Sequence, residues 1–232
     1  MKSMLKACYQ REYETMNVAK PKISKEVMQI DAFYSYVKDR LSDDISIIAI
    51  KSYAERIEGM DFSRMELRSS ILENCKFCSC DFKGASFIDV IFQSCDFSNS
   101  KFADVYFERC QFVDCKCVGL DMHGTVIKQT TFEQSNFKYS NFDETKMTEV
   151  LFDNIDFTES SISEAKLKKF VAKNSRFIKN NFFKTMLATV DFTENEFTMP
   201  LVSTPPIELK GMVINMFQAA DLIGLLGIIV NR

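Results

Sequence analysis

Several residue types and motifs on which enzymes and membrane proteins depend are scarce or missing in this chain of 232 residues. It has no tryptophan and one histidine, His123, and it contains neither a P-loop nor a G-x-G-x-x-G motif. Because no nucleophile is placed to complete a catalytic triad with His123, we expect no enzyme activity and no cofactor. The longest apolar run, residues 225–230 apart from Gly227, is far too short to cross a bilayer.

A large excess of charge of one sign is also missing. The net charge is −3 and the isoelectric point is about 5.4. This balance argues against direct binding of nucleic acid or of an anionic membrane through bulk electrostatics. The first residues lead from Met1 into polar sequence instead of a signal peptide, so we expect a cytoplasmic protein.

Phenylalanine, in contrast, is heavily used, with 22 residues. From Phe62 to Phe197 an apolar residue, called the centre below, falls on every residue number that ends in 2 or 7, which makes 28 consecutive five-residue units. Eighteen of these centres are Phe. A helix repeats every 3.6 residues and a strand every 2, so this period fits neither and predicts a repeat architecture.

The individual units have a common pattern of small residue, Asp or Asn, centre, and two polar residues. Cys80-Asp81-Phe82-Lys83-Gly84 is one example, and the units 95–99 and 135–139 are others. This pattern resembles the pentapeptide-repeat family over about 60% of the chain. The resemblance implies an all-β solenoid, a right-handed quadrilateral β-helix of about seven coils, in which four units make one coil of 20 residues. Each centre then stacks on the centre 20 residues away, as Phe92 on Phe112.

The eight cysteines are explained by their place in the repeat. Five of them lie two residues before a centre, where we expect small core side chains: Cys75, Cys80, Cys95, Cys110 and Cys115. In the C-x-x-C-x-C sequence at 75–80, a square coil directs Cys75 and Cys80 inward and Cys78 outward, so the three cannot share a metal ion. We expect no metal site.

The repeat divides the chain into three parts. Residues 1–44 are predicted to form an N-terminal helical extension that caps the solenoid, with a helix that starts at Ser24 as N-cap and continues to Val37. Residues 45–202 are predicted to form the β-helix. Within them, 45–59 is either an imperfect first coil, which we favour, or a short helix, because Ser52 breaks the register.

The third part, residues 203–232, is predicted to contain a helix over 216–226 and a terminal strand over 228–230, with Asn215 as N-cap and Gly227 after the helix. The helix is apolar nearly all round and needs cover on two sides, which the last coil and a second copy of the chain would supply. The segment is similar to the C-terminal dimerisation module of the quinolone-resistance (Qnr-type) branch of the family. The alternative is a monomer with a simple cap. The expected dimer interface comprises Met216, Phe217, Ala220, Leu222, Ile223, Leu225, Leu226 and Ile228.

The unbroken register assigns every outward residue to one of four faces. Faces one to four start at residues 60–64, 65–69, 70–74 and 75–79, and each continues at every twentieth residue. Face two has seven bases against four acids. Face three is the expected partner-binding surface, because six acids oppose the single base Lys173 and aliphatic side chains accompany them. The alternative is a solvated acidic face that the N-terminal helix partly covers. The residues are Glu73, Asp114, Glu133, Asp153, Asp191 and Glu194, with Ile71, Ile91, Leu151 and Val171.

Two functions are consistent with these features. The Qnr-type resemblance implies a DNA mimic that binds type II topoisomerases (DNA gyrase or topoisomerase IV) and protects them from quinolones or inhibits them. The other function is a protein-protein scaffold or adaptor with no topoisomerase role.

Overall fold

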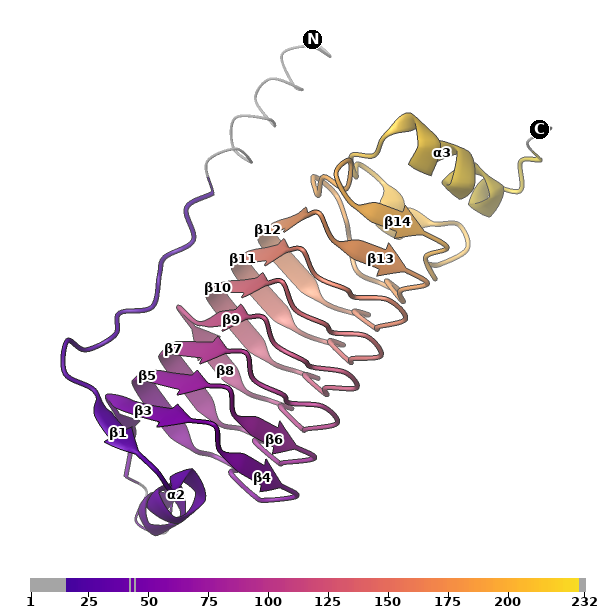
Figure 1. Cartoon of the computed structure of the whole chain (residues 1–232). Helices are drawn as coiled ribbons and strands as arrows, with labels where there is room; N and C mark the ends of the chain where they lie inside the picture. Colours follow the sequence, from indigo (N-terminus) through magenta and orange to yellow (C-terminus); the bar gives the residue numbers. More distant parts are fainter. Residues whose placement is uncertain (1–15, 42, 44, 230–232) are drawn as a thin grey trace.

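A computed structural model describes residues 16–41, 43 and 45–229. The chain winds into a parallel β-solenoid of about eight turns (Figure 1). Neighbouring rungs pair residues that are 20 apart, such as Phe92 with Phe112. Each coil turns at four corners where the backbone adopts a positive φ, as at Ser69 and Asn74 with 47° and 55°. The four-sided solenoid is therefore confirmed, with one turn more than expected because 45–59 forms a coil as well.

Most elements are short strands, and the eight-residue strands each cover two faces by bending at a corner. The described helices are short, and none of them is long and apolar enough to cross a membrane. The elements are β1 (Met28–Ile30), α2 (Phe33–Leu41), β2 (Ile47–Ile48), β3 (Ile50–Tyr53), β4 (Arg56–Glu58), β5 (Glu66–Glu73), β6 (Lys76–Cys78), β7 (Ser86–Gln93), β8 (Tyr106–Glu108), β9 (Gln111–Val113), β10 (Val126–Glu133), β11 (Lys146–Asp153), β12 (Lys166–Lys173), β13 (Arg176–Ile178), β14 (Glu196–Thr198), η1 (Ile207–Leu209), α3 (Met216–Leu222) and η2 (Ile223–Leu226).

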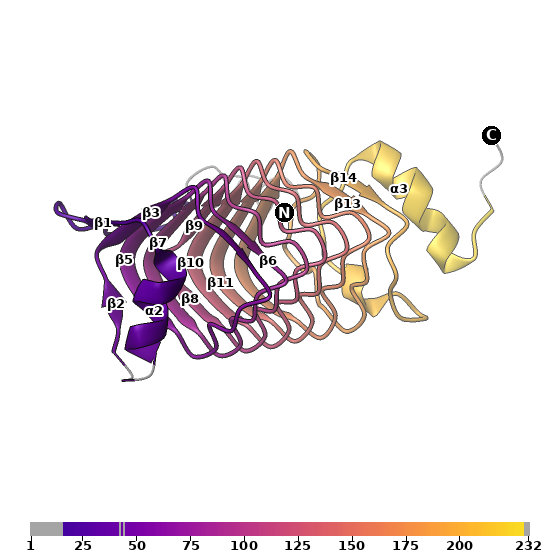
Figure 2. The same ribbon diagram turned by 60° about the horizontal axis from the view of Figure 1, so that its bottom comes forward.

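The walls of the solenoid differ in how continuous their sheets are. Faces two and three form one ten-stranded sheet, whose main path runs from β1 through β3, β5, β7, β8, β10 and β11 to β12. Face four contains the pairs β4–β6 and β13–β14, and face one is joined by single bridges such as that between Asp81 and Lys101. Figure 2 shows the rungs stacked along one axis with a helix at each end.

The core is a set of stacked phenylalanine rings. The ring centroids of Phe92 and Phe112 lie 4.5 Å apart with an interplanar angle of 26°, and those of Phe112 and Phe132 lie 4.9 Å apart at 15°. The predicted stacking is therefore confirmed, and offset aromatic contacts add to the burial of apolar area. The cysteines at 75, 80, 95, 110 and 115 are all buried, while Cys78 is only half-buried, as the repeat predicts.

The N-terminal end differs from the prediction in its first half. The predicted helix from Ser24 begins only at Phe33, and the segment before it forms β1, which pairs in parallel with β3 so that Ile30 lies beside Ser52. The first coil has an open strand edge, and a strand satisfies its backbone groups where a helix could not. Ser52 occupies a centre position and is fully buried, so the favoured coil at 45–59 is correct.

The helix α2 closes the interior below this coil. Phe33 is fully buried, and its ring contacts Phe62 and Phe77 edge-on at centroid distances of 5.6 and 5.2 Å. Its backbone N–H donates to Glu55 Oε1 at 3.1 Å, and Val37 is buried one turn further on. The helix therefore covers the aromatic column at its N-terminal end.

At the C-terminal end, the chain leaves the five-residue repeat and then pairs with the last coil. Val213 forms a bridge with Asp191, and α3 follows Asn215. Asn215 caps the helix as predicted, and Gly227 follows η2 with a φ of 74°. The predicted strand at 228–230 is wrong for its first two residues, because Ile228 and Ile229 are exposed and belong to no strand. Val230 lies outside the described residues.

Candidate partner-binding surfaces

Face three brings the predicted acids together on one wall. Glu133 and Asp153 are direct register partners on β10 and β11, and Glu73 lies in the same column on β5. Asp114 and Glu194 occupy corner positions and are exposed. The remaining acid, Asp191, is half-buried and directly precedes the last centre of the face.

Some of these acids have partners within the chain. Glu73 forms an ion pair with Lys51 at 2.7 Å, and this base belongs to the extra first coil, so face three has a second base besides Lys173. The amide of Asn174 donates to Asp153 Oδ1 at 3.2 Å. The side chain of Glu133 has no hydrogen bond or ion pair within the described part of the chain.

The aliphatic side chains of face three also form one column. Ile71 lies beside Ile91, and Leu151 lies beside Val171. The first three are half-buried, whereas Val171 is only 6% exposed, which corrects the expectation that all four are exposed. The column therefore offers aliphatic edges between the acids, and it is not an open apolar patch.

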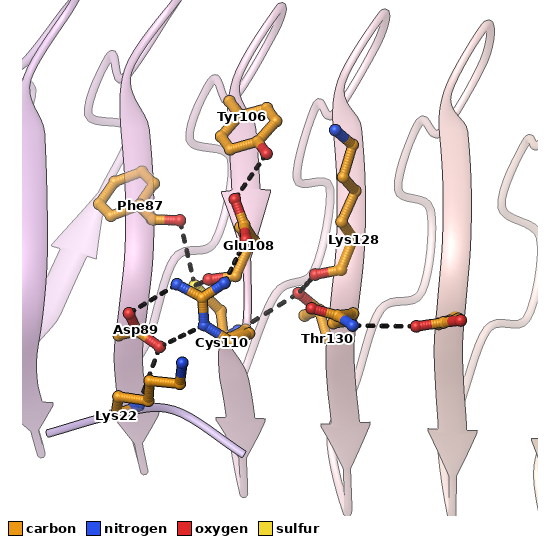
Figure 3. Close-up of polar contacts among 11 residues, drawn as sticks. Lys22, Phe87, Asp89, Tyr106, Glu108, Cys110, Lys128 and Thr130 are labelled. Atoms are coloured by element: carbon orange, nitrogen blue, oxygen red, sulfur yellow. Dashed lines mark hydrogen bonds and ion pairs between the residues drawn. The ribbon is translucent and has the colours of Figure 1, made fainter. Parts of the chain in front are cut away.

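A polar clamp lies at the corner between faces two and three (Figure 3). Arg109 binds Asp89 through two parallel bonds, from Nε to Oδ1 at 2.7 Å and from Nη2 to Oδ2 at 2.8 Å. Arg109 also contacts Glu108, which accepts a bond from the Tyr106 hydroxyl at 2.7 Å. Such bidentate pairs are among the stronger side-chain interactions in proteins.

This clamp holds the segment before β1, residues 16–27, which we call the strap. The backbone N–H of Lys22 donates to Asp89 Oδ1 at 2.9 Å. Val18 is 8% exposed, and Pro21 and Ile23 are half-buried. The strap runs along the solenoid in Figure 1, so part of the N-terminal extension lies against the wall and does not cap the end. Residues 1–15 lie outside the described part.

The surroundings of the clamp shift the pKa values of its members. Burial raises the pKa of Asp89, but the hydrogen bonds from Arg109 and from the Lys22 backbone outweigh it and hold the pKa below its ordinary 3.8. The hydroxyl of Tyr106 lowers the pKa of Glu108, and burial raises the pKa of Tyr106. Both carboxylates are ionised at neutral pH, so the clamp is charged under ordinary conditions.

The C-terminal helices present an apolar surface to solvent. Met216 and Phe217 are both 77% exposed, and Leu226 is 63% exposed. Of the other expected interface residues, Leu222 is buried and Ile223 is half-buried, and the remaining three are exposed. A groove of ≈ 400 Å³ beside them is lined by Pro206, Leu209, Lys210, Met212, Ile214, Ala219, Leu222, Ile223 and Leu226.

Buried polar groups fix this module to the last coil. The Gln218 amide donates to the backbone oxygens of Phe192 and Asn195, both at 2.8 Å, and the Asn215 amide donates to Thr193 O at 3.1 Å. Glu208 is fully buried and accepts bonds from the Lys184 and Ser203 backbones. The exposed apolar face of α3 is therefore held in a defined position.

Residues 85–154 match the family model of the pentapeptide repeat region, and the 20-residue register between neighbouring rungs agrees with this match. The full-length structure of QnrB1, a plasmid-mediated fluoroquinolone resistance protein, is similar at 16% identity over 77% of this chain and 100% of that one, with a TM-score of 0.45. HetL, a pentapeptide repeat protein involved in heterocyst differentiation regulation from the cyanobacterium Nostoc, is also similar. It is 8% identical over 77% of this chain and 93% of that one, with a TM-score of 0.31. No curated protein matches the sequence.

Likenesses this distant say nothing about the partner of this protein, which has to be inferred from its own surfaces. One functional feature, the clamp, was missed by reasoning from sequence. The signal for it was present, because Asp89 and Arg109 are 20 residues apart and opposite in charge. The contact of Lys22 with Asp89 had no such signal, because the strap lies outside the repeat.

Proposed function

We propose that this pentapeptide-repeat protein binds the basic, DNA-binding surface of another protein through face three. A type II topoisomerase, DNA gyrase or topoisomerase IV, is the first candidate partner. In such a complex the carboxylates of face three take the place of DNA phosphates and pair with the lysines and arginines that otherwise bind the duplex.

The adjacent pair Glu133 and Asp153 carries this proposal. Like charges directly opposite each other on neighbouring strands destabilise a sheet, and here they are register partners. Glu133 has no compensating partner among the described residues. A basic partner surface would relieve this repulsion, so the pair is better suited to a complex than to the free protein.

The spacing of the acids supports a comparison with one strand of DNA. Face three extends over about 29 Å from Glu73 to Glu194 if each rung adds roughly 4.8 Å. Its six acids then give about one charge per 5 Å, against one phosphate per roughly 3.4 Å along each DNA strand. Face one, the opposite wall, would supply the second row, with Asp61, Asp81, Asp104, Asp121, Asp143, Glu144 and Glu164.

We also propose that two copies associate through the C-terminal helices. The exposed side chains of Met216, Phe217 and Leu226 would cost solvation free energy in a monomer, and the groove beside α3 would receive them from a second copy. The variant Phe217→Asp with Leu226→Asp should be a monomer by light scattering where the wild type is a dimer. A monomeric wild type at micromolar concentration would contradict this association.

A supercoiling assay tests the topoisomerase proposal. Purified wild-type protein should alter DNA supercoiling by gyrase, or the DNA cleavage that quinolones induce, at micromolar concentration. The variant Glu133→Lys with Asp153→Lys should lose the effect, because it turns two acids of face three into bases.

The matched control is Glu58→Lys with Glu159→Lys, which makes the same charge change at two exposed positions of face four. This control should act like the wild type. An inactive wild type would refute the topoisomerase proposal, and equal activity of both variants would refute the role of face three.

The strap favours a scaffold as the second candidate function. An extended segment held against the wall by a backbone hydrogen bond to Asp89 shows that the wall accepts extended chain. A partner segment could bind in the same way. Deletion of residues 1–44 is unsuitable as a test, because it removes the core residue Phe33. Deletion of residues 1–24 retains β1 and α2, and under the scaffold function it should alter partner capture while the rod stays folded.

A further inference from the structure

Face two uses all of its acids in ion pairs. Glu66 pairs with Arg68, and Glu149 pairs with Lys169. The other two acids, Asp89 and Glu108, both pair with Arg109. These contacts account for three of the seven bases. Four lysines are left over, and we call them the lysine patch: Lys128, Lys146, Lys166 and Lys168.

The lysine patch lies on three neighbouring strands, β10, β11 and β12. Lys146 and Lys166 are direct register partners, and Lys168 lies on the same face two residues after Lys166. All four side chains are exposed, and none has an ion pair with an acid among the described residues. Lys128 lies over the ring of Tyr106 at 5.1 Å.

Such a group of like charges is unfavourable in the free protein. Neighbouring rungs lie roughly 4.8 Å apart, so the Lys146 and Lys166 side chains start from adjacent positions and repel each other. Elsewhere on the solenoid, vertical neighbours compensate each other, as Arg176 does by contacting both Asp156 and Glu196. An anionic partner would remove the repulsion in the lysine patch.

The wall is also open beside this patch. β12 is the last strand of the ten-stranded sheet, and no backbone hydrogen bond joins residues 166–168 to 186–188 in the described chain. Leu187 donates its N–H to Glu208 O at 2.9 Å, in the following turn of the chain. We call this opening the seam. Leu167 is the one centre between Phe62 and Phe197 that is not buried.

A shallow depression of ≈ 490 Å³ occupies the seam. Leu167 and Met186, the latter 48% exposed, give it an apolar floor, and Lys166 and Lys184 lie at its side. Glu164 also lines it and pairs with Lys184 at 3.0 Å. Lys166 is therefore the lysine beside the apolar floor that has no ion pair among the described residues. The complementary ligand carries acids around one apolar residue.

The size and setting of the patch favour a peptide over nucleic acid. Four lysines on three rungs cover only about 10 Å along the axis, and the chain as a whole carries a net charge of −3, which repels a long polyanion. In an extended peptide, acids at alternate positions lie about 6.6 Å apart on one side. This spacing equals that of Lys166 and Lys168 along β12.

We propose that the lysine patch and the seam form a second interaction surface, which binds an acidic segment of a partner protein in an extended conformation. One apolar side chain of that segment enters the depression at Leu167 and Met186. This surface is separate from face three and does not depend on binding to a topoisomerase.

Fluorescence anisotropy with a labelled peptide tests the assignment. The probe is a glutamate-rich peptide of about ten residues with one central leucine. We expect the wild type to bind it and to bind more weakly at high salt. The variant Lys146→Gln with Lys166→Gln should bind at least about tenfold more weakly, with unchanged or slightly higher thermal stability because it removes a like-charge pair.

The control variant is Lys76→Gln with Lys83→Gln, which removes two exposed lysines from faces four and one and should bind like the wild type. Met186→Ser should abolish the preference for the peptide with leucine over one without it. Failure of the wild type to bind, or equal binding by both lysine variants, would overturn the proposal. Tighter binding of a DNA oligonucleotide than of the peptide, lost with Lys146→Gln and Lys166→Gln, would overturn it in favour of nucleic acid.

Discussion

The coils between Phe62 and Phe152 and the coils after Lys166 are built from the same five-residue unit, but their walls are closed differently. In the first region every rung of faces two and three pairs with the next. In the second, no backbone hydrogen bond joins residues 166–168 to 186–188 in the described chain, although 187–192 bonds onward to 208–213, for example from Thr189 N to Gly211 O at 2.9 Å. The core continues in both regions, with Phe192 and Phe197 fully buried.

This difference separates two roles of the sequence. The centres determine the interior, and they do so wherever an apolar residue recurs every fifth position. The closing of a wall depends on whether the backbones of consecutive turns pair, and this pairing is missing between residues 166–168 and 186–188 of the described chain. The proposed sites lie in both regions, since Glu133 and Asp153 belong to the closed wall and Leu167 to the seam.

The largest effect is expected in the closed region. Phe112 is fully buried and stacks on both Phe92 and Phe132. Phe112→Ala should lower the free energy of unfolding by about 3–5 kcal/mol, measured by chemical denaturation. The control Phe183→Ala removes a ring that is 42% exposed and should cost less than about 1 kcal/mol. Equal losses would show that the rings of the column are not specially packed.

A second pair of variants exchanges the interior side chains at the boundary between the regions. Phe170 enters the core two residues before the centre, where it contacts Phe152 at 5.1 Å, and the centre itself is Ala172. Phe170→Ala should cost about 3–5 kcal/mol. Adding Ala172→Phe should recover stability to within about 1.5 kcal/mol of the wild type, because the interior volume is restored. No recovery in denaturation experiments would mean that the seam depends on Phe170 itself.

A substitution at the contact between α3 and the last coil tests the C-terminal region alone. Gln218 is 6% exposed and donates two hydrogen bonds to the last coil. Gln218→Ala leaves two carbonyls without partners and should cost about 1–3 kcal/mol. The expected result is faster proteolysis of residues 216–229 with little change in the central coils. Asp221→Ala, an exposed change on the same helix, is the control and should leave the proteolysis rate unchanged.

The smallest effect concerns the strap. Asp89→Asn weakens the acceptor of the Lys22 N–H and the bidentate bond from Arg109, so opening of the strap should become about five- to tenfold more frequent, or about 1 kcal/mol easier. Faster trypsin cleavage at Lys22 and Lys25 would report it. Asp114→Asn lies on the same wall but does not contact the strap, and it should leave cleavage unchanged.

The same contact has a defined dependence on pH. Because the pKa of Asp89 lies below its ordinary 3.8 in the folded chain, its contribution is fully present above that value and is lost as the pH falls through the lowered pKa. Hydrogen exchange at Lys22 should therefore be constant from neutral pH down to about pH 4, after correction for the intrinsic rate, and protection should fall below it. Loss of protection near neutral pH would point to another group.

Much of the fold could be predicted from the sequence because the residue number of each centre fixes its coil and its face. The five-residue period alone predicts that Phe92 stacks on Phe112. Asn215 and Gly227 marked the two ends of the C-terminal helices. The half of the N-terminal helix that became β1 could not be predicted. Its sequence fits a helix, and only the open edge of β3 makes a strand more favourable.

The candidate surfaces, too, could be predicted from the sequence only in part. The acids of face three follow from the register, as do the four lysines of the lysine patch. The burial of Val171 does not follow from the register. Nor does the position of the strap, because it depends on a contact between the repeat and a residue outside it. The seam has no signal in the sequence of the unit at Leu167, whose centre is apolar like the others.

The most direct test of this account is a double-mutant cycle on the aromatic column. Phe92→Leu and Phe112→Leu should show a coupling free energy of about 0.5–1.5 kcal/mol, because their rings are in contact. Phe92→Leu and Phe152→Leu, three rungs apart, should show a coupling near zero. Equal coupling in both cycles, or none in either, would contradict the twenty-residue stacking on which every surface described above depends.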